Sequence, residues 1–203
     1  MKKLILNFNS KDSKKIKNPK NFLGGKGANL SEMGRMGLPV PPGFTISTKV
    51  CEIFYKDKKK LNKSLISQIK KELKLIEKDV SKKFGDLKNP LLLSVRSGAR
   101  VSMPGMMDTI LNLGLNDKTV KALAIKTSNG RFAKDSYRRF IQMYGNVVMG
   151  VEGYHFEELI ENYKLTKGVL LDTDLDESDW DGLIEDFKRT VREKAKKDFP
   201  QDV

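Results

Sequence analysis

Ser94-Val95-Arg96-Ser97-Gly98-Ala99-Arg100-Val101-Ser102-Met103-Pro104-Gly105-Met106-Met107-Asp108-Thr109 is the most informative stretch of this chain. It follows the compact apolar run Pro90-Leu91-Leu92-Leu93, which predicts a short buried strand entered from a proline. Arginine stays charged and offers five N–H donors, and glycine lets backbone N–H groups come close to a ligand. A loop of this composition suits a polyanion such as a nucleotide phosphate. Surface charges and plain glycine turns are the alternative interpretation, because such motifs are weak signals.

A second glycine turn, Gly24-Gly25-Lys26-Gly27, precedes a predicted short helix. Its spacing is not that of a Walker A loop. It is not a dinucleotide-binding fingerprint either, because Leu30 stands where the third glycine belongs. The turn places one lysine at a helix N-terminus, where N–H groups and an ammonium both favour an anion. A purely structural role for Lys26 is the alternative.

The bulk composition narrows the classes of protein. The 203 residues are 38% hydrophobic and 32% charged, enough for one large or two small folded domains. No apolar run approaches the roughly 18 residues of a membrane span. The single cysteine, Cys51, excludes an internal disulfide and favours a reducing, cytoplasmic setting, and we expect it to be a small core residue.

The net charge of +13 comes mainly from lysine spread along predicted helices. The densest run, residues 56–63, lacks aromatics placed to stack bases, so nucleic acid is not the expected partner. The single histidine, His155, is expected to be a surface or capping residue, since the partners of a catalytic triad or metal site are missing. We interpret the acidic cluster of residues 172–181 as the start of a helix and not as a calcium loop.

Apolar periodicity predicts an α+β chain with two segments, an α/β part over residues 1–114 and a mainly helical part over 115–203. Gly37 is expected to end the helix after the glycine turn, Ser47 or Thr48 to cap the next helix, and Ser178 with Asp181 to cap the last one. Residues 167–171 read as a short return strand or a linker. The expected strands are 3–8, 44–46 and 90–96, and the clearest expected helices are 64–83, 117–127, 132–148, 155–163 and one from 178 onward.

Two blocks together resemble a known family. Residues 23–33 and 37–45, built around Gly24-Gly25-Lys26-Gly27 and Leu38-Pro39-Val40-Pro41-Pro42-Gly43, look like the N-terminal signature of the phosphoenolpyruvate-utilising dikinases. Residues 94–114 are similar to the pyruvate phosphate dikinase branch, as is the run Arg131 to Tyr144. The phosphoenolpyruvate synthase branch usually has a different sequence after the arginine. The resemblance covers essentially the whole chain.

The resemblance implies an ATP-grasp-like N-terminal nucleotide-binding subdomain, followed by a helical subdomain, that holds ATP with magnesium. It implies that Lys26 and Arg96 contact the ATP phosphates. Lys167 matches a further nucleotide-site lysine. The nucleotide loop is implied to include Gly105, Met107 and Thr109.

The resemblance also implies a parent transferase that makes phosphoenolpyruvate from ATP, phosphate and pyruvate through a phosphohistidine on a swivelling domain. Its magnesium ligands, that histidine and the pyruvate barrel are expected outside this chain, so no metal ligand is assigned here and His155 is not the phosphorylated residue. We expect the chain alone to be inactive and its partner to be the remainder of the dikinase polypeptide, the parent being a homo-oligomer. The alternatives are a stand-alone basic binding module and a phosphoenolpyruvate synthase-type fragment.

Overall fold

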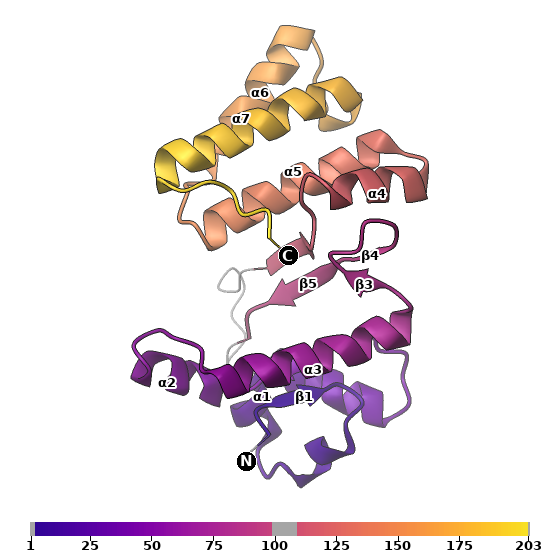
Figure 1. Cartoon of the computed structure of the whole chain (residues 1–203), viewed down its shortest axis with the longest axis vertical. Coiled ribbons are helices and arrows are strands. Elements are labelled where there is room, and N and C mark those ends of the chain that lie inside the picture. Colours follow the sequence, from indigo (N-terminus) through magenta and orange to yellow (C-terminus); the bar gives the residue numbers. More distant parts are fainter. Residues whose placement is uncertain (1–2, 99–108, 203) are drawn as a thin grey trace. The chain divides into compact units, whose positions relative to one another are not determined.

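The computed structural model of the chain describes residues 3–98 and 109–202. These residues form two compact units (Figure 1). The first unit comprises residues 3–81 with 97–98, and the second comprises residues 82–96 and 109–202. Helices predominate and the strands pair into small two-stranded sheets, which confirms the predicted mixed α+β class. Among the described residues, no helix combines the length and the apolar character needed to cross a membrane.

The first unit is a two-stranded sheet covered by helices. Strand β1 pairs antiparallel with β2, Ile5 opposite Ile46, as expected for two of the predicted strands. Helix α3 packs on β1 and helix α1 packs on β2. The small cores are built around Ile5 and Leu6, which point to opposite faces of β1 as successive strand residues do. The elements are β1 (Ile5–Asn7), a 3-10 turn (Lys11–Lys15), α1 (Pro19–Arg35), β2 (Phe44–Ile46), α2 (Lys49–Lys56) and α3 (Lys63–Val80).

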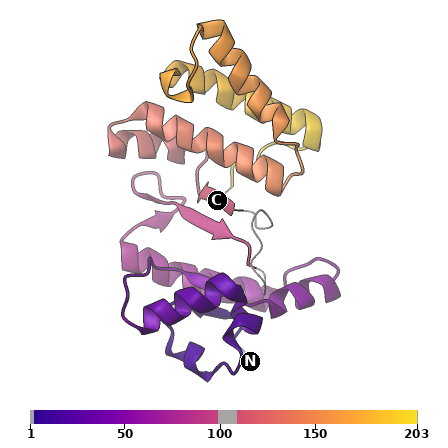
Figure 2. The same cartoon turned by 180° about the vertical axis from the view of Figure 1, so that it is seen from behind.

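In the second unit, a β-hairpin and helices share one core. Helices α4 and α5 lie between the β5–β6 hairpin and the α6–α7 pair, as Figures 1 and 2 both show. Trp180, Phe156 and Phe187 are completely buried in that core. The elements are β3 (Lys83–Phe84), β4 (Pro90–Leu91), β5 (Leu93–Arg96), β6 (Thr109–Leu113), α4 (Thr119–Thr127), α5 (Gly130–Val147), α6 (Tyr154–Lys167), a 3-10 turn (Asp172–Asp174) and α7 (Glu177–Ala195).

The C-terminal tail closes this core. Phe199 is buried, and its ring meets those of Tyr137, Phe140 and Tyr144 edge-on, with centroids 5.6–6.4 Å apart. The Gln201 carbonyl accepts a hydrogen bond of 2.9 Å from Asn116 Nδ2, which ties the tail to the segment after β6. The tail therefore belongs to the folded unit.

Several local predictions are corrected. The run 90–96 is two short strands, because β4 pairs in parallel with β3 whereas β5 pairs with β6. Of the two alternatives for residues 167–171, the strand is wrong and the linker is confirmed: α6 continues to Lys167, Gly168, at φ 71°, ends it, and no strand follows. Cys51 is exposed, because its neighbour Val50 faces the core.

The predicted cap of the last helix is also wrong. The N-cap of α7 is Asp176, whose carboxylate accepts from Ser178 N and Asp179 N at 2.8 and 3.1 Å. Asp179 completes the capping box by accepting from Asp176 N at 2.7 Å.

The predicted end of α1 is confirmed, and the predicted start of α2 is confirmed in position. The left-handed Gly37, at φ 77°, follows directly after the end of α1, as predicted. Thr48 holds the N-cap position of α2, one of the two residues expected there, but its side chain makes no capping bond. The division of the chain at residue 114 stays a prediction. Contact density groups β5 and β6 with the helices that follow, because α5 packs on β6.

Candidate functional site

Lys26 lies just after a break in α1. Gly24 has φ 72° and ψ 169°, a conformation in the region that favours glycine, so the helical path is interrupted and resumes after it. The side chain of Lys26 is exposed on the first turn after this break. The N–H groups that begin a helical segment lack carbonyl partners within it, which makes such a position suited to an anion.

The glycine turn is held in place by the start of α2. The Thr48 hydroxyl donates to the Asn21 carbonyl at 2.6 Å, and Thr48 N donates to the Phe22 carbonyl at 2.9 Å. At Gly27 a Cβ atom would lie only 2.8 Å from Thr45 Cγ2, so glycine is what allows α1 to lie directly on β2. These contacts fix the backbone that carries Lys26.

Sequence reasoning missed this function of Thr48, which the sequence suggested only as a helix cap. No local signal reveals it, because the hydroxyl bonds a carbonyl 27 residues earlier in the chain.

Arg96 and Thr109 are brought together by the β5–β6 hairpin. They are direct partners across the antiparallel pair, where Arg96 ends β5 and Thr109 begins β6. Arg96 is exposed and its Nε donates to Ser94 Oγ at 3.4 Å, whereas Thr109 is half-buried. The hairpin therefore presents a guanidinium and a hydroxyl-bearing residue at one end. Arg100, Gly105 and Met107 lie outside the described residues.

Lys167 is the last residue of α6. Figures 1 and 2 show α6 on the far side of α5 from the β5–β6 hairpin that carries Arg96 and Thr109. Its ammonium pairs with Asp176 at 2.6 Å and with Asp179 at the start of α7. Hydrogen bonds to these two carboxylates, that of Asp176 first, raise the pKa of Lys167. In this structure the side chain neutralises the capping box, and its nucleotide role stays a prediction.

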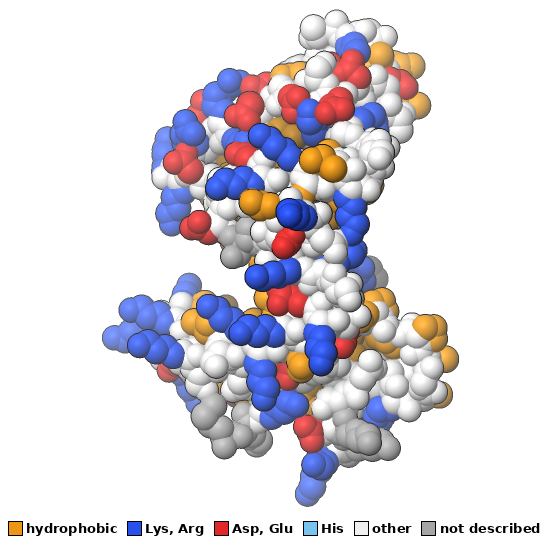
Figure 3. Space-filling view, turned by 45° about the vertical axis from the view of Figure 1, so that its right-hand side comes forward, with side chains coloured by type: hydrophobic (Ala, Val, Ile, Leu, Met, Phe, Trp, Pro, Cys, Tyr) orange, Lys and Arg blue, Asp and Glu red, His pale blue; other side chains and the backbone are white. Residues whose placement is uncertain are grey.

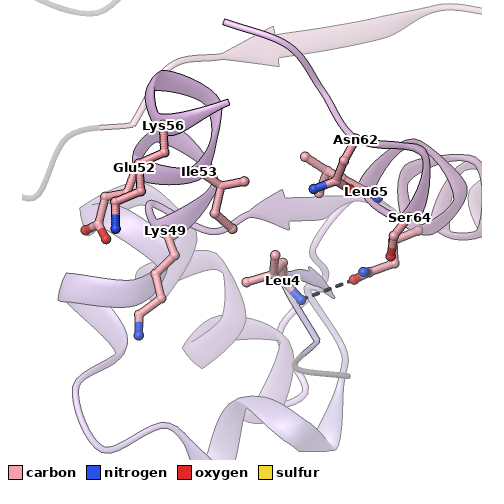
Figure 4. Close-up of a pocket in the computed structure, with 9 residues that line it drawn as sticks. Leu4, Lys49, Glu52, Ile53, Lys56, Asn62, Ser64 and Leu65 are labelled. Atoms are coloured by element: carbon pink, nitrogen blue, oxygen red, sulfur yellow. Dashed lines mark hydrogen bonds between the residues drawn. The ribbon is translucent and has the colours of Figure 1, made fainter. Parts of the chain in front are cut away.

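Other features that could serve chemistry or ligand binding lie elsewhere in the chain. His155 is half-buried and its ring lies 4.0 Å from that of Tyr154, centroid to centroid. Within residues 3–98 and 109–202, no three His, Cys, Asp or Glu side chains gather as a metal site would require. A pocket of about 510 Å³ opens between β1, α2 and the start of α3, and Lys26 does not line it (Figure 4).

The described residues thus carry two separate sets of groups typical of phosphate-binding domains. The first unit has an exposed lysine after a glycine break, and the second has an arginine and a threonine at a hairpin end. Comparison with known proteins is specific. Residues 20–74 match the family described as "Pyruvate phosphate dikinase, AMP/ATP-binding domain", and these residues include Lys26.

Individual relatives extend the match along the chain. This chain is 52% identical to the chloroplastic pyruvate, phosphate dikinase of Flaveria pringlei. The match covers 99% of this chain and 21% of the relative. The Clostridium symbiosum enzyme is 53% identical over 90% of this chain and 21% of the relative. The Rhizobium meliloti (strain 1021) enzyme is 48% identical over 100% of this chain and 22% of the relative. The chain spans about a fifth of the length of these curated relatives.

The chain is accordingly homologous to the N-terminal AMP/ATP-binding part of the pyruvate phosphate dikinases, as its two glycine turns predicted. The relatives from plants bear names marked chloroplastic and the bacterial ones do not.

Proposed function

We propose that this chain is the ATP-binding part of a pyruvate phosphate dikinase, with an ATP-grasp-like arrangement, and that it holds the nucleotide phosphates with Lys26, Arg96 and Thr109. The observation that carries the proposal is the pairing of Arg96 with Thr109 at one hairpin end, in a chain homologous to an AMP/ATP-binding domain. The exposed Lys26 supplies a second cation. Gly105, Met107 and Lys167 belong to the proposed nucleotide site by resemblance only.

The chemistry of these residues is binding and charge compensation. Phosphoryl transfer depends largely on positioning and on cations that offset the phosphate charge. An arginine offers a planar fork to two phosphate oxygens, whereas a lysine acts as a point charge. None of the three is a nucleophile toward phosphorus in this proposal. Among residues 3–98 and 109–202 no three metal-ligating side chains gather, and we assign no residue of this chain to the magnesium that accompanies ATP.

The activity of the whole relatives is also part of the proposal. We expect the parent polypeptide to interconvert ATP, phosphate and pyruvate with AMP, pyrophosphate and phosphoenolpyruvate. Because the chain spans about a fifth of its relatives, we expect it to need the remainder of such a polypeptide to complete that reaction. Pyruvate- and phosphate-dependent formation of AMP by the purified chain would overturn this part.

Calorimetric titration with Mg–ATP tests the binding proposal. Lys26→Ala and Arg96→Ala should each weaken binding by about 10- to 150-fold, since a charge-assisted hydrogen bond contributes roughly 1.5–3 kcal/mol. Lys20→Ala, which removes an exposed lysine of the same helix, is the matched control and should bind as wild type does. In the double variant Lys26→Ala/Arg96→Ala, losses that fail to add would indicate that both residues bind one ligand.

The alternative, a basic module that binds polyanions through many lysines, predicts a different pattern. Binding would then fall steeply with salt and would be lowered equally by Lys20→Ala and Lys26→Ala. Equal affinities of the wild type and the Arg96→Ala variant for Mg–ATP would refute the proposed site.

A further inference from the structure

Charge alone does not distinguish Lys26 from the other lysines of the first unit. Residues 1–81 hold 19 Lys and Arg against 7 Asp and Glu. On the face drawn in Figure 3, basic side chains are spread over that unit. Lys26 is one exposed lysine among many. A preference of phosphate for this lysine therefore has to come from the way the backbone beneath it is held.

The break at Gly24 separates the start of α1 from the remainder of the helix. In an unbroken helix, the carbonyls of Asn21 and Phe22 would accept hydrogen bonds from the N–H groups four residues later. These N–H groups belong to Gly25 and Lys26. Gly24 alone departs from helical geometry, so the continuous helix is the competing conformation of this stretch.

Thr48 bonds the two carbonyls that the continuous helix would use. Its hydroxyl donates to the Asn21 carbonyl at 2.6 Å, and its N–H donates to the Phe22 carbonyl at 2.9 Å. Both hydrogen bonds come from outside α1 and engage acceptors that lie directly before Gly24. They therefore favour the broken conformation over the continuous helix.

The hydroxyl of Thr48 is used differently from that of an ordinary N-cap threonine, which bonds an N–H group of its own helix. Thr48 has φ −56° and ψ −25°, and its side chain makes no capping bond on α2. Its backbone is itself well held. The Thr48 carbonyl accepts from Cys51 N at 3.1 Å, and the preceding Ser47 N donates to the Leu4 carbonyl at 2.9 Å. Thr48 thus connects the glycine turn to the junction of β2 and α2.

We propose that Thr48 is a positioning residue for phosphate binding. Its hydroxyl keeps the turn broken at Gly24 and thereby places Lys26 against the nucleotide phosphates. The inference rests on the proposed function of Lys26. In this account Thr48 does not contact the nucleotide and acts through Lys26. Without the hydroxyl, the turn relaxes toward the continuous helix and this placement is lost.

Calorimetric titration of the chain with Mg–ATP tests the inference. Thr48→Val, which removes the hydroxyl and keeps the shape of the side chain, should weaken binding about 3- to 10-fold, the factor expected for one hydrogen bond. Thr48→Ser, which keeps the hydroxyl, should bind within about twofold of wild type.

Ser47→Ala is the matched control. It removes the adjacent hydroxyl, which is buried and has no hydrogen-bond partner among the described residues, so this variant should bind as wild type does. Circular dichroism melts establish that each variant is folded. Thr48→Ala, which also lacks the hydroxyl, takes the place of Thr48→Val if that variant does not fold.

Combining Thr48→Val with Lys26→Ala separates positioning from a general loss of stability. If Thr48 acts through Lys26, Thr48→Val should change the affinity of the Lys26→Ala variant by less than about twofold. A full effect in that background would overturn the inference. So would a Thr48→Ser variant as weak as Thr48→Val, or wild-type affinity of Thr48→Val.

These three outcomes leave the proposed function standing, provided that Lys26→Ala by itself weakens binding. A wild-type chain that does not bind Mg–ATP, or that binds it no more tightly than Lys26→Ala does, would refute the proposed function and the inference with it.

Discussion

Gly24 is the residue on which the geometry of the glycine turn depends most. It is buried, and its φ of 72° and ψ of 169° interrupt α1 two residues before Lys26. A side chain at this φ clashes with its own backbone, at a cost of order 1–3 kcal/mol. Gly25 has helical backbone geometry. A side chain would therefore be strained at position 24 but not at position 25.

We therefore predict opposite effects of the same substitution at these neighbours. Gly24→Ala should lower the free energy of unfolding of the first unit by about 1–3 kcal/mol and weaken Mg–ATP binding. Gly25→Ala should leave stability unchanged or raise it by up to about 1 kcal/mol, because alanine restricts the unfolded chain. Urea denaturation followed by circular dichroism measures both. Equal destabilisation by the two variants would contradict this account of the turn.

Among the elements, α7 shows how one helix start gathers several charges. Asp176 accepts hydrogen bonds from Lys167, the Ser178 hydroxyl and backbone N–H groups, which together hold its pKa far below the ordinary 3.8. A carboxyl with a lowered pKa in the folded state stabilises that state above the unfolded pKa. This contribution to stability is lost progressively as the pH falls from the unfolded-state pKa through the folded-state pKa of the carboxyl.

The prediction concerns acid unfolding of the second unit. Its stability should fall progressively from about pH 5 through pH 3 and below, because the pKa of Asp176 in the folded state lies far below 3.8. Asp176→Asn should lower stability at neutral pH and flatten this dependence. The fluorescence of Trp180, which is completely buried near the start of α7, reports the transition. Glu193→Gln, which changes an exposed acid of the same helix, should leave the pH profile as it is. An unaltered profile for Asp176→Asn would refute the assignment.

For the whole molecule, the two units differ in how charge affects their stability. The excess positive charges of residues 1–81 repel one another. In the second unit, acidic side chains form ion pairs such as Lys134–Glu177 and Lys188–Asp117. Salt screens repulsion in the first case and attraction in the second.

Raising NaCl from about 0.05 to 0.5 M should therefore raise the urea midpoint of the first unit and leave that of the second unchanged or slightly lower. The only tryptophan, Trp180, lies in the second unit, so its fluorescence follows that unit alone. Circular dichroism follows both. A midpoint shift of the same sign and size by both probes would show that the units respond as one.

Local patterns predicted much of this architecture. The amphipathic repeats of α3, α5 and α7, the strands β1 and β2, and the helix end at Gly37 all lie where spacing and turn chemistry indicate. These signals are readable because they act within one or two turns of chain. The glycine turns and the arginine run also pointed to the family to which the chain is homologous.

Folding in three dimensions decided the remainder. Only packing determined that Val50 and not Cys51 enters the core, that Thr48 bonds the segment before Gly24, and that Phe199 closes the second unit. The partnership of Arg96 with Thr109 likewise required the register of the hairpin. Each of these contacts joins residues distant in the chain or depends on a choice between faces, and the free energy of that choice comes from burial against other elements rather than from neighbouring residues.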